Sequence, residues 1–256
     1  MILSLPLSIS ALLVLITFLY ACWQDLKTRT IYAVTWYPAA VGCAVLMIWF
    51  WIGAFSAPWA AYVFAASVLV ALLMAGFTYF GLFGVADGKA MILLSLAVPI
   101  TPFAAWIFPS LALSSLVNGA VFALIVPAFF CLRNIFAGNR APFWLMCSGK
   151  PVPGDSITKY FGFVSEEITE VNGVISRKFC RPNSSIRALR NRSAMAIRSL
   201  REEPETYASQ LELYAKAGNV WISYGLPFMI PITVGYVTAL FGFSLTDLVL
   251  GFLIMY

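Results

Sequence analysis

Long apolar runs, separated by short polar connections, dominate the chain. Six of them come close to the length of about 20 residues that a helix needs to cross about 30 Å of hydrocarbon. They cover residues 4–24, 33–54, 59–80, 90–109, 113–132 and 220–242. A shorter apolar tail at 244–256 either extends the last run or folds back onto the others. The pattern predicts an all-α polytopic membrane bundle of six transmembrane helices.

One long polar stretch interrupts this pattern, between the fifth and sixth runs. We therefore expect three parts: spans one to five in residues 1–133, a soluble cytoplasmic insert in 134–219, and the sixth span with its apolar tail in 220–256. The predicted fold is thus a membrane bundle that carries a small α+β domain.

The insert has its own local signals. Gly149 and the PVPGD sequence at 151–155 predict turns at its start. Alternating residues around Asn172-Gly173 predict a β-hairpin over 168–179. A serine-capped helix rich in arginine is expected from residue 184, either on anionic headgroups or in solvent. Another helix is expected over 207–218, ending at Gly218.

Composition agrees with a membrane protein and excludes several kinds of site. The chain is 61% hydrophobic and 11% charged, whereas soluble domains are about half apolar and a quarter charged. It has no histidine, which excludes Ser-His and Cys-His catalysis and histidine-ligated metals. Its five cysteines form no CxxC pair. We expect neither a metal nor a cofactor.

The positive charges mark one side of the membrane. Lys27 and Arg29 follow the first span, Lys89 lies between the third and fourth, and the other basic residues lie between positions 133 and 216. The positive-inside rule assigns this side to the cytoplasm, so both termini are expected outside the plasma membrane. The net charge of +5 is therefore an orientation signal and not a nucleic-acid patch. The first run lacks a basic n-region and is interpreted as a retained span.

Outside the insert the chain has three carboxylates, Asp25, Asp87 and Asp247. Asp247 is interpreted as a loop or helix-cap residue. Asp25 ends span one and Asp87 lies before span four, so both reach the cytoplasmic leaflet. A lysine follows each at the second position, Lys27 and Lys89, either to reach the headgroups or to damp the negative charge.

Two carboxyl groups at one membrane depth favour an aspartic-protease pair. Carboxyls that lie close together share one proton, so that one acts as acid while the other activates water. Asp87 is expected on a turn that glycines 81, 84 and 88 make flexible. Asp87 precedes the N-terminus of span four, which favours its anion, and Asp25 lies at the C-terminus of span one, which favours its neutral form, so we expect Asp87 to be mainly the base in the free enzyme.

The sequences around both aspartates resemble a known family. GVADGKA at 84–90 and WQDLKTRTI at 23–31 are similar to the GxGD and first-aspartate motifs of type IV prepilin peptidases, most closely the archaeal preflagellin peptidases. Residues 117–138 and 221–233 resemble the family's fifth and sixth spans. The resemblance is weak over 139–219. It implies that Asp25 and Asp87 are catalytic and that the motif residues Gly84, Ala86, Gly88, Lys89 and Lys27 support them.

One position departs from the family motif. Ala86 stands where GxGD has glycine, and a positive φ there would strain an alanine. The family also implies the activity: removal of a short basic leader from preflagellin, an archaellum precursor, or from other type IV pilin-like preproteins, at the cytoplasmic face. No CxxC pairs of a zinc-binding methylase part are present, so N-methylation is not expected. Glu166, Glu167 and Glu170 are candidates to attract the basic leader.

Three other functions stay open at this point. Membrane carboxylates also mark proton-coupled transporters, although no acid lies at a span centre here. A presenilin-like protease is a second alternative, and a non-catalytic assembly protein is a third. Asn118, the one amide in a span, is interpreted as a link between helices.

Overall fold

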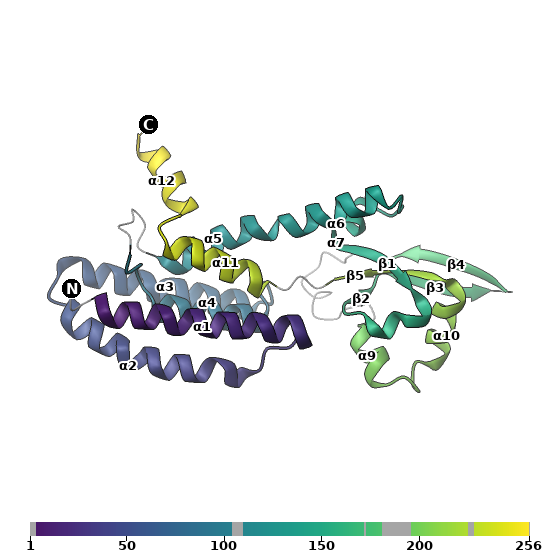
Figure 1. Ribbon diagram of the computed structural model, residues 1–256, viewed down its shortest axis with the longest axis horizontal. Helices are drawn as coiled ribbons and strands as arrows, with labels where there is room; N and C mark the ends of the chain where they lie inside the picture. Colours follow the sequence, from purple (N-terminus) through teal and green to yellow (C-terminus); the bar gives the residue numbers. More distant parts are fainter. Residues whose placement is uncertain (1–3, 104–109, 172, 181–195, 225–227, 256) are drawn as a thin grey trace. The chain divides into compact units, whose positions relative to one another are not determined.

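A computed structural model describes residues 4–103, 110–171, 173–180, 196–224 and 228–255. They fall into two compact units, one made by the described residues of 1–123 and 227–256, the other by those of 124–226. The first unit is helical, and the second combines helices with two small sheets (Figure 1). The expected combination of apolar helices with a small α+β insert is confirmed.

The helical unit begins with antiparallel helices that lie side by side (Figure 1). Its elements are α1 (Ser4–Thr28), the 3₁₀ helix η1 (Ala33–Trp36), α2 (Tyr37–Ala54), α3 (Pro58–Tyr79), α4 (Val85–Ala97), α5 (Leu111–Ala123), α11 (Met229–Leu240) and α12 (Leu245–Met255). Since α1 to α4 alternate in direction, α2 and α4 run parallel. The N-termini of both therefore lie at the end where α1 finishes.

Four helices of the described chain are long and apolar enough to cross a membrane: Leu5–Thr28, Ala33–Ala54, Pro58–Tyr79 and Leu111–Phe136. The pair Met229–Leu240 and Leu245–Leu253, bent by 59°, counts as a fifth if it is one span. The apolar tail thus forms a separate helix at an angle to α11. These helices make the chain a multi-pass membrane protein with four or five candidate spans.

Two expected spans are shorter than their apolar runs. In the run at 90–109, α4 ends at Ala97, and residues 104–109 lie outside the described residues. Val98 has φ −137°, because a residue that precedes proline, here Pro99, is disfavoured in the helical conformation. In the run at 220–242, the first residues form a strand, and helix α11 begins only at Met229.

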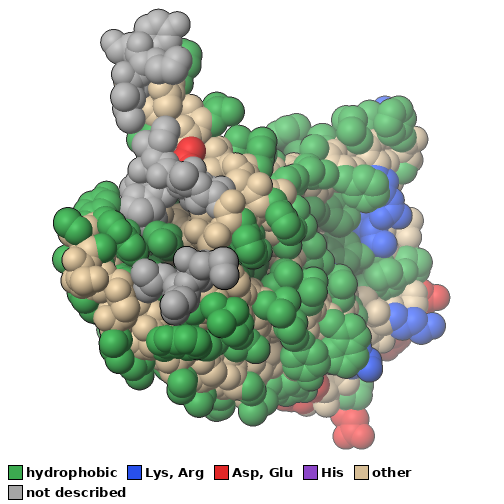
Figure 2. All heavy atoms as spheres, turned by 60° about the vertical axis from the view of Figure 1, so that its left-hand side comes forward, with side chains coloured by type: hydrophobic (Ala, Val, Ile, Leu, Met, Phe, Trp, Pro, Cys, Tyr) green, Lys and Arg blue, Asp and Glu red, His purple; other side chains and the backbone are tan. Residues whose placement is uncertain are grey.

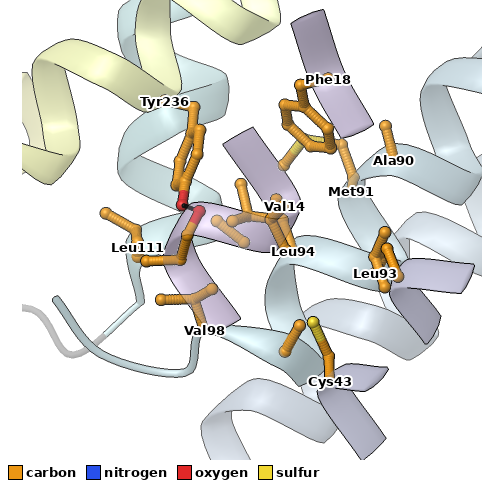
Figure 3. Packing of buried hydrophobic residues seen from close by; sticks show 14 of the residues in the cluster. Val14, Phe18, Cys43, Ala90, Met91, Leu93, Leu94, Val98, Leu111 and Tyr236 are labelled. Carbon is orange, nitrogen blue, oxygen red and sulfur yellow. Dashed lines mark hydrogen bonds between the residues drawn. The ribbon is translucent and has the colours of Figure 1, made fainter. Parts of the chain in front are cut away.

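Side chains from distant helices meet in the core of the helical unit. Phe18 of α1 lies 5.5 Å from the ring of Tyr236 on α11, and beside Met91 of α4 (Figure 3). The Tyr236 hydroxyl donates a hydrogen bond of 2.8 Å to the Ala11 carbonyl. All these side chains are buried, as is Leu94. The helix that carries Asp25 is therefore packed between α4 and α11.

The outer surface of the helical unit is apolar. Hydrophobic side chains (green) occupy much of the described surface turned toward the viewer in Figure 2. Leu12, Val41 and Leu72 are more than half exposed. An apolar surface of this extent is unsuited to water and fits contact with lipid.

Asn118 of α5 links helices, as expected. Its amide nitrogen donates to the Thr238 hydroxyl at 3.1 Å and to the Phe243 carbonyl at 2.7 Å. Its amide oxygen accepts from the Leu245 N–H at 3.1 Å. One buried side chain thus satisfies the backbone between α11 and α12. Asp247 lies in the first turn of α12, where its N–H donates to Ser244 Oγ.

The second unit contains two small antiparallel sheets. Its elements are α6 (Ile125–Phe136), α7 (Phe143–Ser148), β1 (Gly149–Pro153), the 3₁₀ helix η2 (Gly154–Lys159), β2 (Phe163–Val164), β3 (Glu166–Val171), β4 (Val174–Phe179), α9 (Ile197–Glu202), α10 (Ala208–Ala217) and β5 (Asn219–Ser223). One sheet has the order β1-β5-β2, and β3 pairs with β4. Strand β5 therefore belongs to this sheet and not to the sixth membrane helix.

Several expectations for the insert can be compared with these elements. The hairpin is confirmed, with Val171 opposite Val174. Helix α10 is confirmed, and Gly218 ends it with φ 77°. The turns expected at Gly149 and in the first three residues of PVPGD are wrong, because residues 149–153 form β1, an edge strand, where proline is tolerated; the chain turns at Gly154, where η2 begins. Most of the basic helix expected from residue 184 lies outside the described residues.

Candidate active site

Asp25 and Asp87 come from two helices of the same unit. Asp25 lies in the last turn of α1, and Asp87 lies in the first turn of α4. Both side chains are partly buried. The expectation that Asp87 sits on a turn is wrong, because α4 already begins at Val85. A helical position fixes the direction of the Asp87 side chain more firmly than a loop would.

The end of α1 around Asp25 is held by a buried amide. The Gln24 side chain is 6% exposed and accepts a 2.9 Å hydrogen bond from Thr35 Oγ1 of η1. The backbone continues one further turn, with the Arg29 N–H donating to the Asp25 carbonyl at 3.0 Å. Sequence reasoning did not single out Gln24 as a support for Asp25, although an amide inside an apolar run and next to a carboxylate is a signal of this kind of support.

Two motif glycines make room for side chains at the start of α4. A Cβ on Gly84 would lie 2.7 Å from Asp87 Oδ2, so the carboxylate folds back over this glycine. A Cβ on Gly88 would collide with the Thr78 hydroxyl of α3. Gly84 therefore shapes the position of the carboxylate, whereas Gly88 allows α3 and α4 to approach. Thr78 was not singled out from the sequence.

Ala86 fits the motif without strain. It lies inside α4 and packs against the buried core. Within the described residues Arg29 is the one non-glycine residue with positive φ. The departure from GxGD therefore costs nothing in backbone conformation.

The environment of Asp87 favours its neutral form. Asp87 lies ahead of the apolar part of α4 and outside the candidate spans. Burial, and after it the negative charge of Asp25, raise the pKa of Asp87 to about 6. These effects outweigh the helix N-terminus, which favours the anion. This direction runs against the expectation that the helix N-terminus keeps Asp87 ionised as the base of the free pair.

The two carboxylates influence each other without touching. The charge of Asp25 acts on Asp87, yet no hydrogen bond of the described chain joins their side chains. The two groups are thus close enough for electrostatic coupling. They lack the direct contact that sharing a proton requires.

The two motif lysines form no ion pair with the carboxylates among the described residues. The Lys27 ammonium lies 4.9 Å from the centre of the Trp23 ring. Lys89 lines an apolar groove against α2. Neither takes part in the ion pairs found among the described residues. Of the two roles considered for these lysines, contact with headgroups fits this arrangement better than charge neutralisation.

Other side chains at this end of the unit were not found from the sequence. The Phe83 ring, just before α4, lies 6.0 Å from the Phe228 ring at the start of α11. Cys22 Sγ of α1 lies 3.1 Å from Thr233 Oγ1 of α11. These contacts connect the segments around both aspartates to α11. No group of three or more potential metal ligands occurs among the described residues.

The candidate leader-binding glutamates differ in accessibility. Glu166 is 4% exposed, and its Oε1 accepts a hydrogen bond from the Trp221 N–H. Burial raises the pKa of this carboxyl, although Arg177 and the Trp221 N–H oppose the rise. Glu170 is 3.7 Å from the Lys216 ammonium. Glu166 is therefore a structural residue of the insert, and the prediction that it attracts the basic leader at the surface is wrong.

Comparison with protein families matches two models to this chain. The model of the type IV leader peptidase family matches residues 12–133, and the model of the archaeal peptidase A24 C-terminus, type II, matches residues 141–242. The chain belongs to the type IV leader peptidase family. The second match covers most of the insert, where the resemblance had looked weak. Comparison with curated proteins finds no match.

Family membership gives this leader peptidase its general chemistry. It is a protease, of the aspartic type in this family, that acts as an archaeal prepilin or preflagellin peptidase on a prepilin-like substrate. The first match contains both Asp25 and Asp87. The resemblance drawn from the motifs is confirmed at the level of the family.

Proposed function

We propose that Asp25 and Asp87 are the catalytic pair of this leader peptidase. The observation that carries the proposal is their electrostatic coupling across α1 and α4, within the region matched by the family model. Asp247, the third carboxylate outside the insert, lies in the first turn of α12, where its N–H donates to Ser244 Oγ. It is therefore interpreted as a helix-terminal residue and not as a member of the pair.

The proposed mechanism needs one proton on the pair. The ionised carboxylate takes a proton from a water molecule, which attacks the scissile carbonyl carbon. The protonated carboxyl donates to the carbonyl oxygen and later to the leaving nitrogen. A pKa of about 6 for Asp87 supports this, because about a tenth of Asp87 then still carries a proton at pH 7, whereas an aspartate with the ordinary pKa of 3.8 would be almost fully ionised. The proton belongs to the pair, not to one residue.

Catalysis on this scheme requires the carboxyl groups to approach each other. The connection from α3 to α4 contains Gly81, whose φ of 75° favours glycine, and Gly84, which contacts the Asp87 carboxylate. A small shift at these glycines moves the first turn of α4. We propose that substrate binding brings this shift about, so that the pair forms only with a leader in place.

The proposed substrate is preflagellin or another type IV pilin-like preprotein. Its basic leader lies in the cytoplasm and its hydrophobic helix lies in the bilayer, which puts the scissile bond at the membrane boundary. Asp25 at the end of a span and Asp87 ahead of an apolar helix suit this depth. Cleavage is proposed to occur without N-methylation, since the chain has no CxxC pair.

The proposed topology has six spans, with the apolar part of α4 as one and α11 with α12 as another. Residues 134–219 form the cytoplasmic insert, and both termini are outside. The basic residues of the sequence support this orientation. Cysteine-accessibility mapping tests it: Asp25 and Asp87 on opposite faces would remove the catalytic proposal.

The activity is tested by incubating membrane extracts of the full chain with a preflagellin. The wild-type protein is expected to shorten the substrate, and Asp25→Asn and Asp87→Asn are each expected to abolish cleavage. Asp247→Asn is the matched control and should cleave normally. Mass spectrometry of the product tests for a methyl group. Full cleavage by either active-site variant would contradict the proposed pair.

A further inference from the structure

A long apolar groove lies on the helical unit, between α2 and α4. Its volume is about 770 Å³. Its walls are side chains of α2 and α4, with Trp36 of η1 and Phe64 of α3 at its ends. Lys89 is the one charged residue among the side chains that line it. The groove therefore combines a hydrocarbon-like surface with a single positive charge.

The groove and the aspartates lie on different sides of α4. Asp87 and Lys89 are two residues apart, which separates them by about 200° around a helix. Met91 and Leu94, on the side of Asp87, are fully buried in the core. Ile92 and Leu96, on the side of Lys89, line the groove. A ligand in this groove is thus separated from the catalytic pair by the body of α4.

The charge lies at one end of the groove. Lys89 is in the first two turns of α4, and Tyr37 begins α2, so both mark the end where α1 finishes. At the other end Phe64 lies 5.3 Å from Trp51 and 5.9 Å from Phe55, ring centre to ring centre. The 18 residues of α2 span about 27 Å, close to the thickness of a hydrocarbon core.

We propose that this groove binds an anionic membrane lipid. The lipid phosphate lies on the Lys89 ammonium, and one acyl or isoprenoid chain runs along α2 past Ala40 and Ala44. These small residues leave room for a chain between α2 and α4. The Lys89 end of the groove then corresponds to the headgroup of the lipid, and the apolar walls correspond to its hydrocarbon chain, as in a lipid of the surrounding leaflet.

The charge of Lys89 favours this occupant over the alternatives. Lys89 is exposed and forms none of the ion pairs among the described residues, so its ammonium is available to a phosphate. A basic residue near the surface attracts anionic lipids. A substrate helix placed here would present its scissile bond to the wrong side of α4.

The test uses the full-length protein reconstituted in phosphatidylcholine vesicles. A small fraction of the lipid is replaced by phosphatidylglycerol or phosphatidylcholine with brominated chains, which quench tryptophan fluorescence on contact. Trp51 lines the groove, so its fluorescence reports a brominated chain bound there. The variant Trp51→Phe shows how much of the total quenching comes from Trp51. Brominated phosphatidylglycerol is expected to reach half-quenching at about fivefold lower content than brominated phosphatidylcholine, the preference that one basic residue confers.

Two variants separate the site from general attraction to the surface. Lys89→Gln should remove the fivefold preference. Lys27→Gln removes the same charge from the same end of the unit, outside the groove, and should keep it. Ala44→Phe fills the groove and should reduce quenching by both lipids, with unfolding temperature checked to exclude misfolding.

Three outcomes would overturn the proposal. The first is equal quenching by the two brominated lipids in the wild-type protein. The second is an equal loss of preference in Lys89→Gln and Lys27→Gln, which would mean surface attraction alone. The third is relief of quenching by a peptide with the hydrophobic helix of preflagellin, which would assign the groove to the substrate.

Discussion

The coupling of the two aspartates makes a specific prediction for Asp25→Asn. The replacement keeps the size of the side chain and removes its negative charge. Burial of Asp87 is unchanged, so only the electrostatic cause of its raised pKa is lost. The pKa of Asp87 is therefore expected to fall while staying above the ordinary value of 3.8.

The size of this fall follows from the structure. The pKa of Asp87 is raised from 3.8 to about 6, and burial is the larger cause. The whole rise is worth about 3 kcal/mol in favour of the neutral form. The share of Asp25 is below half, so Asp25→Asn should lower the pKa by less than about one unit. At pH 6 the ionised fraction of Asp87 would rise from about half to at most about nine-tenths.

Infrared difference spectroscopy of protein with ¹³C-labelled aspartate measures this directly. The carboxyl band of neutral Asp87 is identified by its loss in Asp87→Asn and is followed across a pH titration. Asp247→Asn serves as the control and should leave the midpoint in place. An unchanged or higher midpoint in Asp25→Asn would show that Asp25 exerts no field on Asp87 and would refute the coupled pair.

Three further predictions follow from individual contacts. Gly84→Ala presses on the Asp87 carboxylate and should lower preflagellin cleavage at least about tenfold, whereas Gly76→Ala, which meets no atom within 4 Å, should cleave normally; equal rates would dismiss the contact. Because its pKa is raised in the folded protein, Asp87 contributes stability that is fully present below pH 3.8 and lost as pH rises through about 6. Asp87→Asn should therefore flatten the pH dependence of the unfolding free energy measured in detergent, and an unchanged slope would contradict the raised pKa. Asn118→Leu leaves the Leu245 N–H without its acceptor and should lower the unfolding free energy by about 1–3 kcal/mol, measured by thermal unfolding. A smaller decrease would mean that other groups replace the amide.

Much of the fold follows from local patterns in the sequence. The apolar runs predicted the helices α1, α2 and α3 close to their observed bounds, because a span needs only length and hydropathy. The hairpin around Asn172-Gly173 was also predictable, since two residues set its turn. Both features depend on neighbours along the chain.

Other elements depended on partners that are distant in sequence. Residues 220–223 open an apolar run long enough for a span, yet together with Asn219 they form β5, because β1 and β2 supply hydrogen-bond partners on both sides. The PVPGD sequence has the composition of a turn, and its first three residues are strand because β5 lies beside them. The early end of α4 has a local cause instead, since Val98 precedes Pro99 and is disfavoured in the helical conformation.

For this protein, helices α1, α2 and α3 and the motifs around Asp25 and Asp87 could be read from neighbouring residues of the sequence. Tertiary structure alone decided the coupling of Asp87 to Asp25, the contact of its carboxylate with Gly84, and the direction of Lys89 toward the groove. The physical reason is that burial and electrostatic fields come from side chains of other helices. Their positions are fixed only when α1, α2, α4 and α11 pack together.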